Sequence, residues 1–462
     1  MAYTTIDDPT IYFNTKLYTG NGSNGHAITG VGFQPDWVWI KGRSVAENHN
    51  VYDAVRGAGE RLIPNGSNAE STKTDTHKSF DSDGFTLDLG AEVNDNTQTF
   101  ASWNWLAGGT APAITYSVKV VSDSGNKYRF DDFGTSAVTL DLQEGGTYTF
   151  DQSDSSNSGH PLRFSTTSDG SHGGGSEYTT GVTTTGTPGS AGAKTVITVA
   201  SGTATLYYYC SVHSGMGGQA NTNSTFGSSN FSGSVQTKVS ANTTAGFSIV
   251  SYTGTGSVGT FGHGLNSKPN MMIQKKLNGS TAWTVYHDKV ASDPATDYLY
   301  LSSASAVADY ADHYNDTEPT SSVFTLGTDT SINGSGTPNI TYCFHEVKGY
   351  SKIGSYTGNN QDPDGTFVYT GFAPAWVIAK KTDGAHDWTI KDSKRPGYNE
   401  NNKNLNANLN NAEESNDEVD FLSNGFKWRD NDGASNASNT YIYMAFAESP
   451  FVNSNGVPNN AR

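Results

Sequence analysis

The chain has 462 residues, which is too long for one ordinary domain and predicts three or four domains. A formal net charge of −17 argues against nucleic acid and anionic membranes as partners, because binding phosphate groups requires a basic surface. Only 34% of the residues are hydrophobic, yet 24 Tyr, 21 Phe and 8 Trp exclude a disordered chain and favour many short strands joined by polar turns.

The N-terminal residues are polar and acidic, without the basic and apolar segments of a secretory signal peptide. No apolar run approaches the length of a membrane-spanning helix. We therefore expect synthesis in a cytoplasm and no membrane insertion. The two cysteines, Cys210 and Cys343, fall in different predicted domains, so no disulfide framework is expected.

Four landmarks recur three times in the same order, which predicts three copies of one β-rich unit. The first is a Tyr-Thr-Gly tripeptide after a strand-like run, at Tyr18–Gly20, Tyr252–Gly254 and Tyr356–Gly358. The second contains a Gly and a Pro and continues into an apolar strand, at Gly32–Lys41, Gly264–Lys275 and Gly371–Lys380. The third is a turn that leads into a strand, at Ser82–Leu87, Ser321–Leu326 and Ser423–Trp428. The fourth is an aromatic closing strand, at Phe100–Trp105, Thr341–Glu346 and Tyr441–Phe446.

The spacing of the tripeptides predicts an insertion between the first two copies. Tyr252 and Tyr356 are 104 residues apart, whereas Tyr18 and Tyr252 are 234 residues apart. The excess of 130 residues has the size of one small domain. It predicts an inserted domain between Gly109 and about Phe247.

The inserted segment is predicted to be a β-sandwich with strands at 116–121, 137–142, 147–151, 162–165, 195–199 and 204–209. The last of these strands leads into a loop with Cys210, His213 and Met216, and His160 lies fifty residues before Cys210. These side chains supply two imidazoles, one thiolate and one thioether, the donor set of a blue-copper site. Zn²⁺ would accept the imidazoles and the thiolate together with a water molecule. A buried structural cysteine is the alternative without a metal.

The order of these four residues in a β-rich segment resembles the cupredoxins of the plastocyanin and amicyanin kind. The resemblance implies His160 as the first copper ligand, and Cys210, His213 and Met216 as ligands from the loop before the last strand. It also implies copper as the cofactor and electron transfer as the activity. One position departs from the family, since Pro161 follows His160 where cupredoxins have an asparagine that tethers the ligand loops.

No set of residues predicts an enzyme. The acidic pairs at 413–414 and 417–418 lie in an Asn-rich loop and indicate solvated charges. Asp362 and Asp364 resemble part of a calcium-binding loop, but the bidentate glutamate of that loop is absent. The histidines outside the inserted segment are scattered singly, without the spacing of metal ligands.

The landmarks of the copies, together with the opening stretch Asp7–Asn14, resemble a domain that recurs in structural proteins of tailed bacteriophages, especially marine and cyanobacterial ones. The resemblance implies a virion protein, either a tail fibre or appendage or a capsid decoration. Its implied partners are other virion proteins and a host-cell surface glycan or protein. A homo-oligomer is expected, with a trimer favoured by analogy. The resemblance names no ligand-binding residue.

We therefore predict an all-β protein with jelly-roll or lectin-like β-sandwich copies at 1–110, 246–349 and 350–452. A cupredoxin-like β-sandwich is predicted at 114–222, a Gly/Ser-rich linker at 223–245 and a C-terminal tail at 453–462. The leading hypothesis is a phage virion protein that acts in particle assembly or host attachment. The alternatives are a copper-binding electron-transfer protein and a secreted cellular adhesin. Four tryptophans could stack on sugars if exposed, although their alternating positions favour burial: Trp37, Trp39, Trp376 and Trp388.

Overall fold

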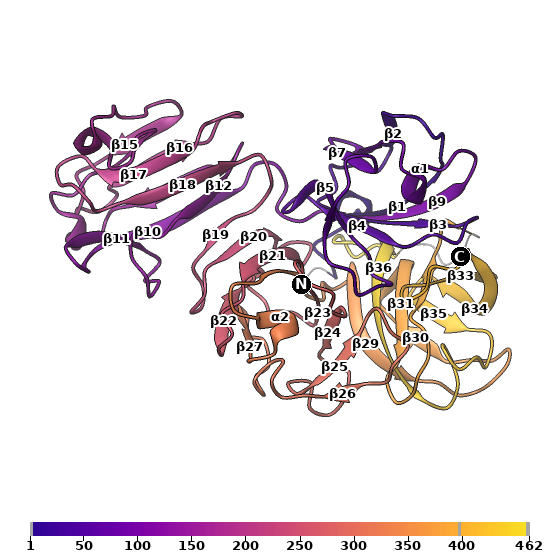
Figure 1. Ribbon diagram of the computed structural model, residues 1–462. Helices are drawn as coiled ribbons and strands as arrows, with labels where there is room; N and C mark the ends of the chain where they lie inside the picture. Colours follow the sequence, from indigo (N-terminus) through magenta and orange to yellow (C-terminus); the bar gives the residue numbers. More distant parts are fainter. Residues whose placement is uncertain (1–2, 396–398, 459–462) are drawn as a thin grey trace. The chain divides into compact units, whose positions relative to one another are not determined.

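The computed structural model describes residues 3–395 and 399–458 and confirms the all-β class (Figure 1). The chain divides into two compact units. The repeat unit comprises the residues up to Ala107, Ala241–Val258 and the residues from Leu265 onwards. The insert unit comprises Gly108–Ser240 and Gly259–Gly264. Among the described residues, no helix is both long and apolar enough to cross a membrane.

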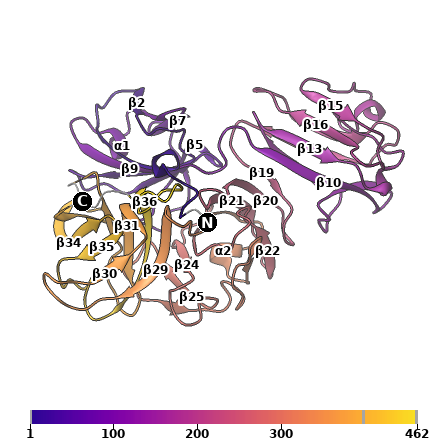
Figure 2. The same cartoon turned by 180° about the vertical axis from the view of Figure 1, so that it is seen from behind.

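Each predicted copy contributes one large antiparallel sheet to the repeat unit (Figures 1 and 2). Copy 1 has the order β1 (Phe13–Thr19), β9 (Thr99–Trp105), β3 (Trp37–Gly42), β4 (Asn50–Asp53), β5 (Gly57–Leu62) and β6 (Ser71–Thr72). Copy 2 has β21 (Phe247–Thr253), β28 (Pro338–Phe344), β23 (Met271–Lys276), β24 (Thr284–His287), β25 (Asp297–Tyr300) and β26 (Ala308–Asp309). Copy 3 has β29 (Ser351–Thr357), β36 (Thr440–Pro450), β31 (Phe372–Lys381), β32 (Thr389–Asp392), β33 (Asn401–Asn406), β34 (Glu414–Leu422), β35 (Gly425–Trp428) and β30 (Phe367–Tyr369).

The same four strands therefore lie side by side in each sheet: the first, the last, the apolar strand and the strand after it. Copy 1 adds a small sheet of β2 (His26–Thr29), β8 (Gly84–Leu87) and β7 (His77–Asp81). The short elements of the repeat unit are η1 (Pro9–Ile11), α1 (Ala91–Asn94), β27 (Val323–Leu326) and α2 (Thr330–Asn333). Of the tail predicted at 453–462, residues 459–462 lie outside the described part of the chain.

The Tyr-Thr-Gly landmark recurs because it contacts a buried asparagine about 80 residues later in each copy. Tyr252 donates its hydroxyl hydrogen to the carbonyl of Ile332, and the Asn333 side chain accepts from the backbone of Thr255. A Cβ on Gly254 would lie 2.4 Å from the carbonyl oxygen of Gly334. The equivalent hydroxyl bonds join Tyr18 to Val93 and Tyr356 to Ser435, next to the buried Asn94 and Asn436. Each landmark thus ties the first strand of a copy to its last turn.

The large sheets bury both faces because the three copies share one aromatic core. Phe13 stacks on Phe446 with ring centroids 5.0 Å apart, which joins copies 1 and 3. Trp37 stacks on Tyr342 at 4.7 Å, which joins copies 1 and 2. The ring of Phe344 meets Phe446 edge-on at 6.1 Å, which joins copies 2 and 3. Such contacts explain why β3, which begins with the continuous apolar run Trp37–Ile40, is buried at every position.

All eight tryptophans are among these buried side chains, each at 1% exposure or less. Trp37, Trp39, Trp376 and Trp388 are therefore not available for stacking on a sugar. Their burial follows from the second covered face of each sheet, which places both alternating sets of side chains in a core.

Equivalent ring nitrogens form a closed cycle of hydrogen bonds around the three copies. His49, Trp283 and Trp388 each directly precede the strand that follows the apolar strand. Trp283 donates to the carbonyl of Ile63 in copy 1 at 2.9 Å, and Trp388 donates to that of Tyr300 in copy 2 at 2.9 Å. His49 accepts from Trp39 at Nδ1, so its Nε2 carries the proton and donates to Asn406 of copy 3 at 3.0 Å. Each copy is thereby bonded to the next.

Three buried lysines occupy equivalent positions near the ends of the apolar strands. Lys275 donates to the carbonyl of Ser67 in copy 1, and Lys380 donates to that of Ala304 in copy 2. Lys41 donates to the carbonyl of Gly42. Burial lowers the pKa of each of the three ammonium groups to about 8, because the charged form loses its hydration.

The insert unit is a sandwich of two sheets that enclose a core of its own. One sheet has the order β11 (Asn126–Phe130), β10 (Ala113–Ser122), β13 (Thr147–Asp151), β16 (Lys194–Thr198) and β15 (Val182–Thr185). The other has β12 (Leu140–Gln143), β18 (Gly218–Asn223), β17 (Leu206–Cys210) and β14 (Leu162–Ser165). The ends of the segment meet, since the backbone NH of Gly108 donates to the hydroxyl of Ser240 at 3.0 Å.

The segment 223–245, predicted as a linker, contains β19 (Ser228–Asn230) and β20 (Thr237–Asn242). Phe231 lies between them and is buried in the core of the insert unit, where it stacks on Phe130 at 5.8 Å. This single aromatic anchors a Gly- and Ser-rich stretch whose composition alone indicates a linker. Beyond it, β22 (Gly259–Gly262) also belongs to the insert unit.

The three buried lysines contribute stability that rises with pH between about 8 and 9.5, whereas buried tyrosines with raised pKa values contribute in the opposite direction. In this window the unfolded lysines, with an ordinary pKa of 10.5, bind more protons than the folded ones, so raising the pH favours the folded state. Lys275→Met removes one of the three groups and should make this rise shallower. Denaturant midpoints of both proteins at pH 8.0, 8.75 and 9.5 measure this difference in slope. The contributions of the other titrating groups are common to the two proteins and cancel when the curves are subtracted. Parallel curves for the two proteins would contradict the prediction.

Candidate metal centre

The pairing of two strands brings the predicted ligands together. Strands β14 and β17 run antiparallel with Leu162 opposite Cys210. His160 lies two residues before Leu162, so it reaches the end of β17 where Cys210 is the last residue. The chain then turns through a short loop that carries His213 and Met216 before β18 begins at Gly218.

His160, Cys210 and His213 form a compact triangle of donor atoms. The sulfur of Cys210 lies 3.9 Å from Nδ1 of His160 and 3.8 Å from Nδ1 of His213. The donor atoms of the three residues all lie within 4.8 Å of one another. Metal bonds of about 2.0 Å to nitrogen and about 2.3 Å to sulfur hold those atoms roughly 3.7 Å apart at a trigonal angle. The triangle therefore fits one metal ion with little movement.

Met216, the fourth predicted ligand, lies in apolar surroundings. It is buried at 1% exposure and belongs to the apolar core of the insert unit. It also lines the same shallow pocket as His213, together with Val212 and His172. A thioether at the edge of the core suits the weak axial ligand of a copper site, which needs no charge and no polar surroundings.

The two imidazoles differ in their surroundings. Cys210 is fully buried, His160 is half-buried and His213 is exposed. Partial burial lowers the pKa of His160, and the positive charge that His213 takes up on protonation lowers it further. The neutral imidazole that results is the form that binds a metal. The exposed ring of His213 leaves one edge of the centre open to the solvent.

The loops around the ligands are tethered even though Pro161 replaces the usual asparagine. The carbonyl of His160 accepts hydrogen bonds from the Tyr128 hydroxyl and from the Gln152 amide, each at 2.9 Å. The backbone NH of Ser211 donates to the carbonyl of Pro161 at 3.1 Å and links the two ligand segments directly. Backbone and buried side chains thus hold His160 without an asparagine at position 161.

The ligand loop is also supported by three residues that the sequence pattern did not identify as part of the site: His172, Asp169 and Lys127. The 3-10 helix η3 (Gly170–Gly173) places Nε2 of His172 3.1 Å from the carbonyl oxygen of Cys210. Asp169 accepts from the backbone NH of Gly215 at 2.9 Å, and Lys127 donates to the Gly215 carbonyl. These residues lie far from the ligand loop in sequence and have no regular spacing to it. A Gly-rich stretch around His172 was the only signal, and it indicates a loop.

Comparison with known families found one match, to a model described as a domain of unknown function, DUF7483. The model matches residues 8–131 and 220–450, which contain the landmarks of the three copies. The unmatched stretch 132–219 contains all four predicted ligands. No curated protein and no solved structure gave a match.

Tyr128→Phe should weaken Cu²⁺ binding about tenfold or more, because it removes one of the two side-chain donors that fix the His160 backbone. Competition titration against a chelator of known affinity measures the change. Tyr148→Phe is the matched control, since Tyr148 is buried in the same core and bonds to Gln143 and Ser228 rather than to a ligand. Equal affinities for the two variants would show that Tyr128 does not position His160.

Proposed function

The chain belongs to the DUF7483 family, and we propose that it carries a type-1 copper site in a segment inserted into that family's domain. The supporting observation is the triangle of His160, Cys210 and His213, with all donor atoms within 4.8 Å. A soft thiolate between two imidazoles, with the buried thioether of Met216 in the same loop, is a donor set that favours copper.

Copper accounts for this donor set better than zinc does. Zn²⁺ would use two imidazoles and a thiolate and would take a water as its fourth ligand. Here the next potential donor in the loop is the buried Met216, three residues after His213; a thioether is a donor that Cu(I) prefers and Zn²⁺ does not.

Bound copper supplies one-electron redox chemistry, and the protein residues set the conditions for it. Burial of Cys210 keeps water away from the sulfur. Tyr128, Gln152 and Ser211 hold the backbone around His160, so the ligands need little rearrangement. The exposed ring of His213 offers a short path to a redox partner. The proposed activity is therefore electron transfer.

The test is the absorption spectrum of the purified chain on titration with Cu²⁺. An intense visible charge-transfer band from thiolate to copper is expected, with a stoichiometry of one. Cys210→Ser should abolish the band and weaken copper binding. Cys343→Ser is the matched control, because Cys343 is equally buried but belongs to the repeat unit. Copper affinity that is unchanged in Cys210→Ser would refute the site.

We propose as a second function that the repeat unit is a structural component of a tailed-phage particle. The sequence resemblance of the copies is the basis for this proposal. The hydrogen-bond cycle through His49, Trp283 and Trp388 supports the proposal of a structural role. Each pair of copies is joined by a buried hydrogen bond, and such cross-linking suits a protein that bears mechanical load. A secreted cellular adhesin remains the alternative for such a unit.

Mass spectrometry of purified phage particles tests the structural role. The chain should co-purify with infectious particles at a constant ratio to the major capsid protein through a density gradient. Host cells lysed without phage assembly provide the control for adhering debris. If the chain is absent from particles but present in the medium of uninfected cells, it is an adhesin and not a virion protein.

A further inference from the structure

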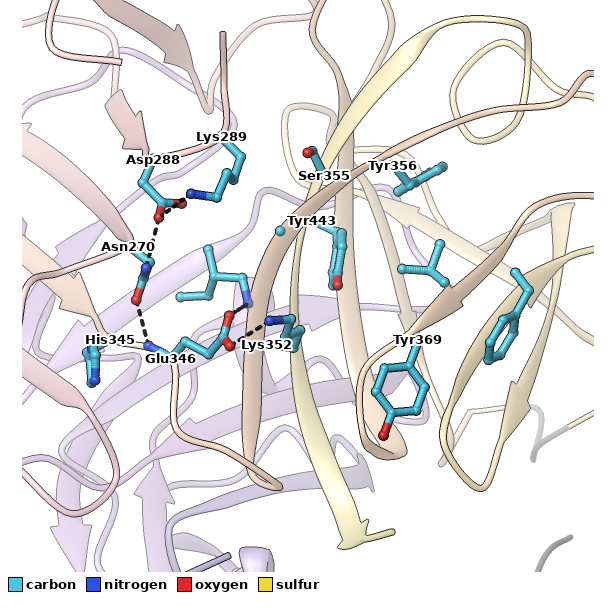
Figure 3. A pocket seen from close by; sticks show the side chains of 14 residues that line it. Asn270, Asp288, Lys289, His345, Glu346, Lys352, Ser355, Tyr356, Tyr369 and Tyr443 are labelled. Carbon is cyan, nitrogen blue, oxygen red and sulfur yellow. Dashed lines mark hydrogen bonds and ion pairs between the residues drawn. The ribbon is translucent and has the colours of Figure 1, made fainter. Parts of the chain in front are cut away.

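A groove of about 690 Å³ lies in the repeat unit where copies 2 and 3 meet (Figure 3). This volume is within the range of small-ligand sites. One wall comes from strand β30 of copy 3, and the opposite wall comes from polar residues of copy 2 and of the segment that joins the copies. Neither the metal centre nor the family match assigns a role to it.

The wall from copy 3 presents two exposed aromatic rings. Strand β30 alternates, with Val368 buried and its neighbours Phe367 and Tyr369 exposed by 44% and 52%. The Tyr369 hydroxyl lies 3.3 Å from that of Tyr3, which restrains the ring. All tryptophans of this protein are buried, whereas Phe367 and Tyr369 leave about half of each side chain exposed on the same strand. Aromatic side chains that line a concave surface are typical of ligand-binding pockets.

The floor of the groove depends on a glycine. A Cβ on Gly354 would lie 3.0 Å from the hydroxyl of Tyr443, so a larger residue there would push that ring away from the strand. Figure 3 shows Tyr443 between the polar wall and Tyr369. The exposed hydroxyl of Ser355 lines the groove beside them.

The polar wall is a connected and charge-balanced network, formed by residues of copy 2 together with Lys352 from β29 of copy 3 (Figure 3). The Asn270 amide donates to Asp288 at 2.9 Å and accepts from the backbone NH of Glu346 at 2.8 Å. Lys352 pairs with Glu346 at 2.6 Å, and Lys289 pairs with Asp288 at 3.2 Å. Two carboxylates and two ammonium groups leave no net charge. The wall therefore offers directed hydrogen bonds and does not select a charged ligand.

We propose that this groove binds a neutral oligosaccharide. A pyranose ring has a face of C–H groups, which suits the rings of Phe367 and Tyr369, and an edge of hydroxyls, which suits the paired donors and acceptors opposite. A bound peptide is the less favoured ligand, because β30 is only three residues long and offers little edge for main-chain pairing. The groove does not depend on the metal centre or on residence in a phage particle.

The experiment is a glycan array probed with the full-length protein, followed by calorimetry with the best neutral oligosaccharide. Tyr369→Ala and Phe367→Ala should each reduce affinity roughly tenfold, since each removes one stacking ring. Both side chains are exposed, so folding is preserved, and circular dichroism checks this. Tyr310→Ala is the matched control, because Tyr310 is a similarly exposed tyrosine, at 43%, outside the groove. The affinity of the Tyr310→Ala variant for the oligosaccharide should stay within about twofold of that of the unsubstituted protein.

Three results would overturn the proposal: no neutral glycan bound, binding of acidic glycans or peptides alone, or full affinity in both aromatic variants. Cys210→Ser separates this proposal from that of the copper site. It should lose the copper band and keep the glycan affinity, so either function can fail without the other.

Discussion

The repeat unit depends on one aromatic core that three copies share. Phe13, Trp37, Tyr342, Phe344 and Phe446 come from all three copies, and their rings contact one another, stacked, tilted or edge-on, between the copies. No copy can bury this face of its sheet alone, so the three are expected to fold as one cooperative body. The ring-nitrogen bonds of His49, Trp283 and Trp388 cross between copies, as do the bonds of two buried lysines, Lys275 and Lys380. These buried polar groups find carbonyl partners in a neighbouring copy.

The groove proposed to bind a ligand and the tolerance of the insertion both follow from the way the chain is arranged in its two units. The groove exists because copy 2 and copy 3 meet with unlike surfaces, Asn270 and Glu346 on one side and Tyr369 on the other. The insertion is tolerated because Gly108 and Ser240 meet at the ends of the insert unit, so the chain leaves and returns at nearly the same point. A rigid repeat unit can therefore carry a separate small domain without distorting its own core.

The proposed metal centre lies in the insert unit, and the proposed glycan groove lies in the repeat unit. The centre uses buried sulfur and a tethered histidine, which favour little rearrangement on electron transfer. The groove uses exposed rings and paired charges, which favour reversible binding of a solvated ligand. The family match covers the landmarks of the copies and omits 132–219, so the four candidate ligands lie outside the residues that the family model matches.

The sequence by itself determined the all-β class, the recurring landmarks and the four candidate ligands, because strand alternation, turn residues and ligand order are local patterns. It could not determine which surface covers each strand, and so it left open exposed tryptophans that the shared core buries. It also gave no indication of the contacts made by Asn333, Tyr128 and His172, whose partners lie about 30 to 80 residues away. Only the tertiary structure decided these contacts, because strand pairing and sheet packing bring together residues that share no local pattern.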